Sequence, residues 1–305
     1  MSLISLLIAL AAERYLSSSA WQFSVYYQRY LRLFKKLDIL GSPSKSTITN
    51  LIFLLVPVIV CYAVLAIVED GLLHLIVSTL VLIACFGCFK TRDTYKQYLM
   101  AAFRGEATTC SLYHKQLMQD KNLPDMGFGQ TLVWLNYRYF IAIMLFFVLF
   151  GAPGALFYRL LTKLNESPLC QLEHEEYLLK ANLDDAQKAE QYQECKPCDD
   201  SNNEVLRLNQ RLLFIIDWVP VRIVAFGYML VGHFSRAFPV WLENLFATEK
   251  QAHYVLIDVA QKSEDFMVDQ DDCTAEPCLL VRLAKRTLLL CLATVSMLII
   301  TGVVN

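Results

Sequence analysis

The chain has 305 residues, of which 56% are hydrophobic and only 18% are charged. Because soluble globular domains carry about 25% charged residues, this composition excludes an ordinary soluble enzyme and points to a membrane environment. Lys and Arg total 27 against 29 Asp and Glu, a formal net charge of −2, so the charge balance gives no support for a nucleic-acid-binding protein.

An apolar helix is predicted over residues 1–16. A signal peptide carries its positive charge before the apolar run, whereas here Glu13 and Arg14 follow the run. The run is also too short to cross a bilayer, which takes about 20 helical residues. We therefore expect a retained helix that is partly inserted or lies in the membrane interface, with the N-terminus in the cytoplasm.

Residues 21–37 combine aromatic and basic side chains at helical spacing. This pattern fits an amphipathic helix that rests on anionic lipid headgroups. It fits equally well a helix that packs on the cytoplasmic face of the protein. In both cases residues 1–47 form an N-terminal region of interfacial and cytoplasmic helices.

Four stretches are long and apolar enough to be transmembrane helices, since a helix rises about 1.5 Å per residue and the hydrocarbon core is roughly 30 Å thick. They lie at 48–68, 72–89, 131–150 and 287–304. We predict a transmembrane hairpin over 48–89, a third transmembrane helix over 131–157 and a C-terminal transmembrane helix over 286–305.

The charges on either side of the hairpin predict its orientation. The link at residues 69–71 contains no Lys or Arg, whereas several basic residues precede and follow the hairpin. Basic loops tend to stay in the cytoplasm. Residues 1–47 and the helix and loop at 90–130 are therefore expected inside, and the link is expected outside.

Residues 212–231 are apolar but contain Asp217, Pro220 and Arg222, each of which is costly against lipid. If this segment crosses the membrane, the residues after it are cytoplasmic and the C-terminus is external. If it is a broken amphipathic or partly inserted helix, residues 158–285 form one periplasmic region and the C-terminus is internal. The cysteines favour the second interpretation.

Five of the ten cysteines fall in the polar parts of this 158–285 region. Such clustering is typical of an oxidising compartment, in which disulfides stabilise a small domain. The alternatives are zinc-bound thiolates and free thiols, and no metal site is predicted. The disulfide candidates are Cys170, Cys195, Cys198, Cys273 and Cys278.

Three charges interrupt the apolar runs. Arg138 lies within the third predicted span, where it either snorkels beside aromatic residues or faces inward and holds an anionic headgroup or phosphate. Asp217 and Arg222 either pair with each other or with groups on neighbouring helices, or bind a polar ligand at a helix break. Because charges within a membrane are costly, we expect function at these positions.

Several motifs resemble those of the AmpE family of inner-membrane proteins. They are the run from Trp134 to Phe140, the run from Asp217 to Arg222, Gly227-Tyr228, Gly232-His233, and the run from Phe238 to Trp241. The resemblance covers nearly the whole chain. It implies a multi-pass protein of the bacterial inner membrane that acts as a regulator or sensor in β-lactamase induction and antibiotic resistance, with a link to peptidoglycan recycling.

The AmpE family is distantly similar to the CbiB/CobD membrane enzymes of cobalamin synthesis, whose signature is incomplete in this sequence. That relation implies an alternative function, a membrane-embedded ligand-binding protein or enzyme related to adenosylcobinamide-phosphate synthase that acts on a phosphorylated or lipid-linked substrate. The ligand-binding residues would then be Arg104, Asn136, Arg138, Arg159, Asp217 and Arg222.

The expected fold class is an all-α, polytopic integral membrane protein with four transmembrane helices and amphipathic or partly inserted helices at 1–16 and 212–231. The sequence contains no complete catalytic motif, so no catalytic residue and no cofactor are predicted. The expected partners are the lipid bilayer, a phosphorylated or lipid-linked ligand and a second copy of the chain, with no nucleic acid.

Overall fold

The structure is a computed structural model that describes residues 2–15, 22–37, 47–68, 71–86, 89–166, 200–247, 249–264 and 274–302. These residues form helices and turns, and no strand occurs among them. In chain order the elements are α1 (Ser2–Tyr15), α2 (Phe23–Leu37), α3 (Thr47–Ile67), α4 (Leu72–Phe86), α5 (Phe89–Phe103), α6 (Ala107–Lys121), α7 (Phe128–Asn136), the π-helical η2 (Tyr137–Ile141), α8 (Ala142–Glu166), α11 (Asp200–Val231), α12 (Phe234–Leu245), α13 (Ala252–Ser263) and α14 (Ala275–Ile300).

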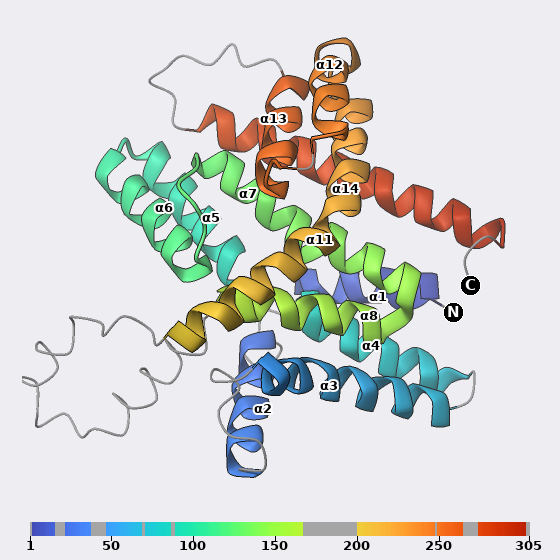
Figure 1. Ribbon diagram of the computed structural model, residues 1–305. Coiled ribbons are helices and arrows are strands. Elements are labelled where there is room, and N and C mark those ends of the chain that lie inside the picture. The colour runs from blue at the N-terminus through green and yellow to red at the C-terminus, as the bar shows by residue number, and fades with distance from the viewer. Residues whose placement is uncertain are drawn as a thin grey trace, which may run out of the picture.

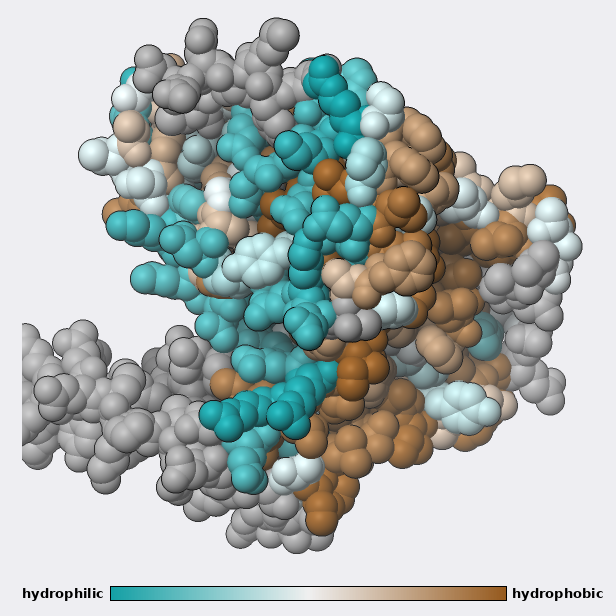
Figure 2. Space-filling model, turned by 45° about the horizontal axis from the view of Figure 1, so that its top comes forward, coloured by the Kyte–Doolittle hydropathy of each residue, from teal (hydrophilic) through white to brown (hydrophobic). Residues whose placement is uncertain are grey.

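Five helical stretches within these ranges are long and apolar enough to cross a membrane. They are Thr47–Ile67, Leu72–Phe103 (α4 and α5, with residues 87–88 between them outside the described ranges), Phe128–Glu166, Glu204–Val231 and Ala275–Ile300. Four coincide with or overlap the predicted spans, which confirms an all-α polytopic membrane fold, and the fifth contains the segment 212–231 that the sequence left undecided. On the face shown in Figure 2, hydrophilic residues gather over one half of the molecule and hydrophobic residues over the other.

The stretch Phe128–Glu166 folds back on itself at Gly151. This glycine has φ +70° and ψ −164°, a conformation outside the helical region that glycine adopts easily. The rings of Phe146 and Tyr158 stack with centroids 4.8 Å apart across the break, although a straight helix would separate these residues by about 18 Å. The chain therefore forms two antiparallel arms, visible in Figure 1, in place of the single third helix predicted over 131–157.

Helix α11 runs without a break from Asp200 to Val231, in contrast to the broken helix considered for residues 212–231. The side chains of Asp217 and Arg222 are only 1% and 6% exposed. Neither charge therefore faces lipid, and the chain remains helical through Pro220. An apolar row on the outer side of the helix, which we call the α11 stripe, consists of Ile215, Val219, Ile223, Phe226 and Leu230.

Contacts between distant segments gather many helix ends at one end of the bundle, which we call the polar end. They include Arg92 with Glu13 at 3.2 Å, Asn50 with Asn209 at 2.8 Å and Lys121 with Glu166 at 3.6 Å. The start of α1, the end of α3, the start of α4 and the end of α14 lie at the opposite end (Figure 1).

Helices α12 and α13 pack beside α11. A Cβ atom at Gly232 would lie 2.3 Å from the backbone oxygen of Ser263, so only glycine allows the two segments to approach this closely. The backbone N–H of His233 donates a hydrogen bond to the same oxygen at 2.8 Å. This junction positions α13 so that His253 reaches Trp134 in α7.

Candidate functional site

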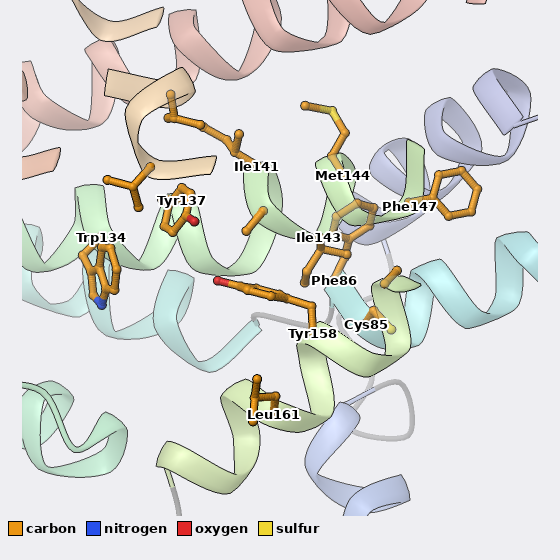
Figure 3. Packing of buried hydrophobic residues seen from close by; sticks show 14 of the residues in the cluster. Cys85, Phe86, Trp134, Tyr137, Ile141, Ile143, Met144, Phe147, Tyr158 and Leu161 are labelled. Carbon is orange, nitrogen blue, oxygen red and sulfur yellow. The ribbon is translucent and has the colours of Figure 1, made fainter. Parts of the chain in front are cut away.

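Asp217 of α11 is buried where α11 meets the two antiparallel arms of Phe128–Glu166, which we call the hairpin from here on. Its Oδ1 accepts hydrogen bonds from the hydroxyl of Tyr137 at 2.7 Å and from the hydroxyl of Tyr158 at 2.8 Å. Figure 3 shows the two tyrosines, one from each arm, with their hydroxyls directed toward the same region. One carboxylate oxygen therefore joins three segments that are far apart in the sequence.

Tyr137 opens the π-helical turn η2, which runs from Tyr137 to Ile141. A π-helical turn holds an extra residue, so it changes the direction of the side chains that follow, and such turns are frequent at functional sites. Arg138 and Tyr139 both lie in this turn. The turn therefore sets the direction of the Arg138 and Tyr139 side chains. They lie in the region around Tyr137, Tyr158 and Asp217, which we call the polar interior.

Arg138 lies over Trp134, with its Cζ atom 4.8 Å from the centre of the indole ring. The guanidinium forms no hydrogen bond or ion pair with any residue that the structure describes, and its Nε is buried without an acceptor. Asp217 and Glu166 are nearby carboxylates, but both lie beyond ion-pair distance from it. A guanidinium carries five N–H donors, so Arg138 can bind an anion.

His253 of α13 approaches the same indole edge to face, with ring centroids 5.8 Å apart. Its Nε2 atom is buried and has no hydrogen-bond partner within the described ranges. Burial, and then the positive charge of Arg138, lower the pKa of His253 to about 4. The imidazole is therefore neutral at neutral pH, and Arg138 and His253 both contact Trp134 with unused hydrogen-bonding atoms.

A second polar cluster surrounds Glu166 at the end of α8. The carboxylate lies 3.6 Å from Lys121 Nζ, 3.7 Å from Lys163 Nζ and 3.8 Å from Arg159 Nη1. The hydroxyl of Tyr139 also donates a hydrogen bond to it. Both Glu166 and Arg159 are buried. Because breaking a buried ion pair is strongly destabilising, this cluster fixes α6, η2 and α8 relative to one another.

Four of the six residues predicted to bind a ligand come from the segments that form this polar interior: Asn136, Arg138, Arg159 and Asp217. Within it Arg159 and Asp217 have the partners described above. The Oδ1 atom of Asn136 is buried and accepts no hydrogen bond from a described residue. Among these four residues, Arg138 therefore has the most hydrogen-bond donors still available to a ligand.

Arg222 and Arg104 lie elsewhere. Arg222 donates hydrogen bonds to the backbone oxygens of Leu245 at 2.8 Å and Ala247 at 2.5 Å, so it fixes the end of α12 to α11. Residues five apart on a helix face different sides, which explains why Arg222 does not form the ion pair considered with Asp217. Arg104 is exposed in the turn between α5 and α6.

The sequence reasoning missed Tyr137, Tyr158 and Glu166 as polar partners. Buried tyrosines usually find a hydrogen-bond partner for the hydroxyl. Tyr137 and Tyr158 each directly precede an arginine, Arg138 and Arg159. This adjacency to an intramembrane charge is the signal that could have identified them.

Four of the predicted disulfide cysteines, Cys170, Cys195, Cys198 and Cys273, lie outside the described residues. Cys278 is a free thiol among the described cysteines, and its Sγ lies 4.0 Å from the hydroxyl of Tyr95. Within the same ranges no group of His, Cys, Asp and Glu side chains is arranged to hold a metal ion.

Comparison with known proteins assigns the chain to a family. The sequence model of the family described as "Regulatory signalling modulator protein AmpE" matches residues 1–166 and 194–305. The chain belongs to the AmpE family. Protein AmpE of Shigella flexneri is 23% identical over 240 residues, which cover 75% of this chain and 74% of that protein. No solved structure is significantly similar to the chain.

The AmpE match includes both arms of the hairpin and the helices from α11 to α14. Trp134, Arg138, Asp217 and His253 therefore all lie within the residues that the family model matches. Family membership and the apolar helices together make this an AmpE-like regulatory protein of the multi-pass, inner-membrane type.

Proposed function

We propose that this AmpE-family chain acts in β-lactamase induction, as a regulator or sensor at the inner membrane in the response to cell-wall antibiotics. The observation that carries the proposal is the match of the AmpE family model to residues 1–166 and 194–305. The buried core supports a sensing role, because Asp217 links α11 to both arms of the hairpin through Tyr137 and Tyr158. Such a hydrogen-bond network can transmit a change at one helix to the others.

The test is an induction experiment in the native host. Deleting the gene should alter β-lactamase induction by a β-lactam, and the wild-type gene should restore it. Asp217→Leu should fail to restore it, because this change removes the acceptor of two hydroxyls. Ile215→Leu, on the outer side of the same helix, is the matched control and should restore it. Both variants must reach the membrane at the wild-type level.

Unchanged induction in the deletion strain would overturn this proposal. Full restoration by Asp217→Leu, with a normal amount of protein in the membrane, would show that the regulatory role does not need the hydrogen bonds to Asp217. The family assignment would stand in either case, since it rests on the sequence match.

A second candidate function is the binding of a phosphorylated or lipid-linked molecule inside the bundle. The observation that favours it is the guanidinium of Arg138, which is without a hydrogen bond or ion pair among the described residues and has its Nε buried. An unpaired cation inside a protein costs several kcal/mol. A phosphate group would supply the missing acceptors, since guanidinium groups bind phosphate through two parallel hydrogen bonds.

Binding by the purified protein tests this candidate. Inorganic phosphate and phosphatidylglycerol are added separately in an uncharged detergent, and the shift of the thermal unfolding midpoint is measured. Stabilisation by one of them should be lost in Arg138→Gln and kept in Arg104→Gln, which removes an exposed arginine. Stabilisation by the phospholipid alone would identify a lipid headgroup. Equal shifts in the two variants, or no shift in the wild type, would exclude the site.

A further inference from the structure

Helix α12 carries an apolar face that the rest of the described protein does not cover. Four side chains form it, three on the helix and the last directly after it: Phe234, Phe238, Leu242 and Phe246. They are 39% to 78% exposed, although each is large and hydrophobic. Exposed apolar rows of this kind mark surfaces that contact a partner or a membrane.

The other faces of α12 are different in character. Ala237 and Asn244 are buried against the protein, on the face that anchors the helix. Arg236 and Glu243 are exposed on a third face. At 100° per residue, the centres of the apolar, polar and buried faces lie roughly 100° to 130° apart around the helix. The helix therefore presents an apolar face and a separate exposed polar face, with the buried face holding it against the protein.

The apolar face of α12 continues into the α11 stripe. The rings of Phe226 in that stripe and Trp241 in α12 have centroids 5.3 Å apart, and Trp241 also stacks near Phe238 at 6.4 Å. The two rows thus form one apolar surface on neighbouring helices, and α11 is itself apolar enough to lie within a membrane. On the face shown in Figure 2, hydrophobic and hydrophilic residues meet along a boundary that crosses the molecule.

The position of α12 on the bundle is fixed by polar contacts. The Nε1 atom of Trp241 donates a hydrogen bond to the backbone oxygen of Arg222 at 3.2 Å. Arg222 in turn donates to the backbone oxygens of Leu245 and Ala247. The apolar face is therefore held outward by the fold, and no movement is needed to expose it.

From these contacts we infer that α12 lies in the plane of the membrane interface, with the side chains of Phe234, Phe238, Leu242 and Phe246 among the acyl chains of one leaflet. With 12 residues the helix is about 18 Å long, too short to cross a bilayer. Amphipathic helices bind in this way, with the apolar face about 5–10 Å below the headgroups. Trp241 lies beside the apolar row, as is typical of tryptophan at an interface. The inference is independent of the regulatory function proposed above.

Photo-crosslinking in liposomes of phosphatidylethanolamine and phosphatidylglycerol tests this placement. The full chain is made with p-benzoylphenylalanine in place of Phe238, Leu242 or Glu243, one position at a time. After irradiation, mass spectrometry should find lipid adducts at positions 238 and 242 at about tenfold or more the yield at position 243. Position 243 is the matched control, because it lies on the same helix one residue from Leu242.

Two further results would overturn the inference. Cross-links between two copies of the chain at position 238 or 242 would show that the apolar face is a dimer interface. Equal yields of lipid adducts at positions 238 and 243, or no adducts at 238 and 242, would show that the helix does not separate lipid from water. Gel filtration and the unfolding midpoint of each variant establish that the labelled protein is folded, and Leu242 replaces Phe238 if that variant fails to fold.

Discussion

Asp217 accepts both tyrosine hydroxyls of the buried core through one oxygen. We expect Tyr137→Phe and Tyr158→Phe each to lower the free energy of unfolding by roughly 1.5 to 3 kcal/mol, the range for hydrogen bonds to a charged group. The double variant should lose more than the sum, because it removes both donors from a buried carboxylate. Thermal unfolding in a single detergent measures the effect.

The control for this pair is Tyr26→Phe, which changes an exposed tyrosine of α2 and should unfold like the wild type. A double variant as stable as the wild type would contradict the arrangement of Tyr137, Tyr158 and Asp217 described above.

His253 should make the stability of the protein depend on pH. Burial and the nearby Arg138 lower the pKa of His253 from its ordinary value of 6.5 to about 4. Between these values the unfolded chain binds a proton that the folded chain does not bind. Stability should therefore fall as the pH falls from 6.5 toward 4, and His253 should have no effect above this window.

Unfolding midpoints at pH 7.5, 5.5 and 4.5 measure this dependence. The loss between pH 7.5 and 4.5 should be smaller in His253→Gln than in the wild type. Parallel profiles for the wild type and His253→Gln would show that the buried histidine does not contribute.

At the scale of helices, the close approach of α11 and α13 depends on Gly232. A Cβ atom there would lie 2.3 Å from the backbone oxygen of Ser263. We expect Gly232→Ala to cost about 1–3 kcal/mol, as overpacking usually does. Gly127→Ala should cost less than about 1 kcal/mol, because its new Cβ would only touch the Gln130 side chain at 3.4 Å. Unfolding midpoints of the two variants, which should differ clearly, provide the comparison.

The reversal at Gly151 determines how many times the chain crosses the bilayer. As a single helix, Phe128–Glu166 would carry the chain from one side to the other. Because it folds back, Glu166 returns to the polar end, where it pairs with Lys121. The start of α11 lies at the same end, since Asn209 contacts Asn50 of α3.

For the molecule as a whole, we propose that the polar end faces the cytoplasm. The basic residues near the starts of α5 and α14 lie at this end. The end of α3 and the start of α4 lie at the opposite end, and the sequence that links them, residues 69–71, contains no Lys or Arg. Basic segments favour the cytoplasmic side. This proposal differs from the sequence-based expectation that residues 158–285 are periplasmic. The start of α1 would then lie on the side opposite the cytoplasm, whereas the sequence-based expectation places the N-terminus in the cytoplasm.

Reporter fusions in the native membrane test this orientation. Alkaline phosphatase fused after Glu166 should be inactive, and a fluorescent protein at the same point should be bright. After Thr301 the two reporters should behave in the opposite way, since α14 begins near the polar end and ends at the other. Active phosphatase after Glu166 would restore the periplasmic assignment of the region that follows.

Part of the site could be predicted because it depends on single residues. Arg138 and Asp217 stand out as charges in apolar runs, and the structure buries Asp217 and half-buries Arg138 at the polar interior. Arg222 gives the same signal in the sequence but binds backbone oxygens at the end of α12. The sequence could not separate these cases, because the partner of a buried charge is set by packing.

The sequence by itself determined that the protein is an all-α membrane protein and located four of its apolar stretches, because hydrophobicity over some 20 residues decides whether a helix can lie in a bilayer. Only the tertiary structure decided that Phe128–Glu166 is a hairpin and that Tyr137, 80 residues before Asp217, donates to it. It also placed His253 beside Trp134. These features depend on one glycine conformation and on contacts between distant residues, which local composition does not encode.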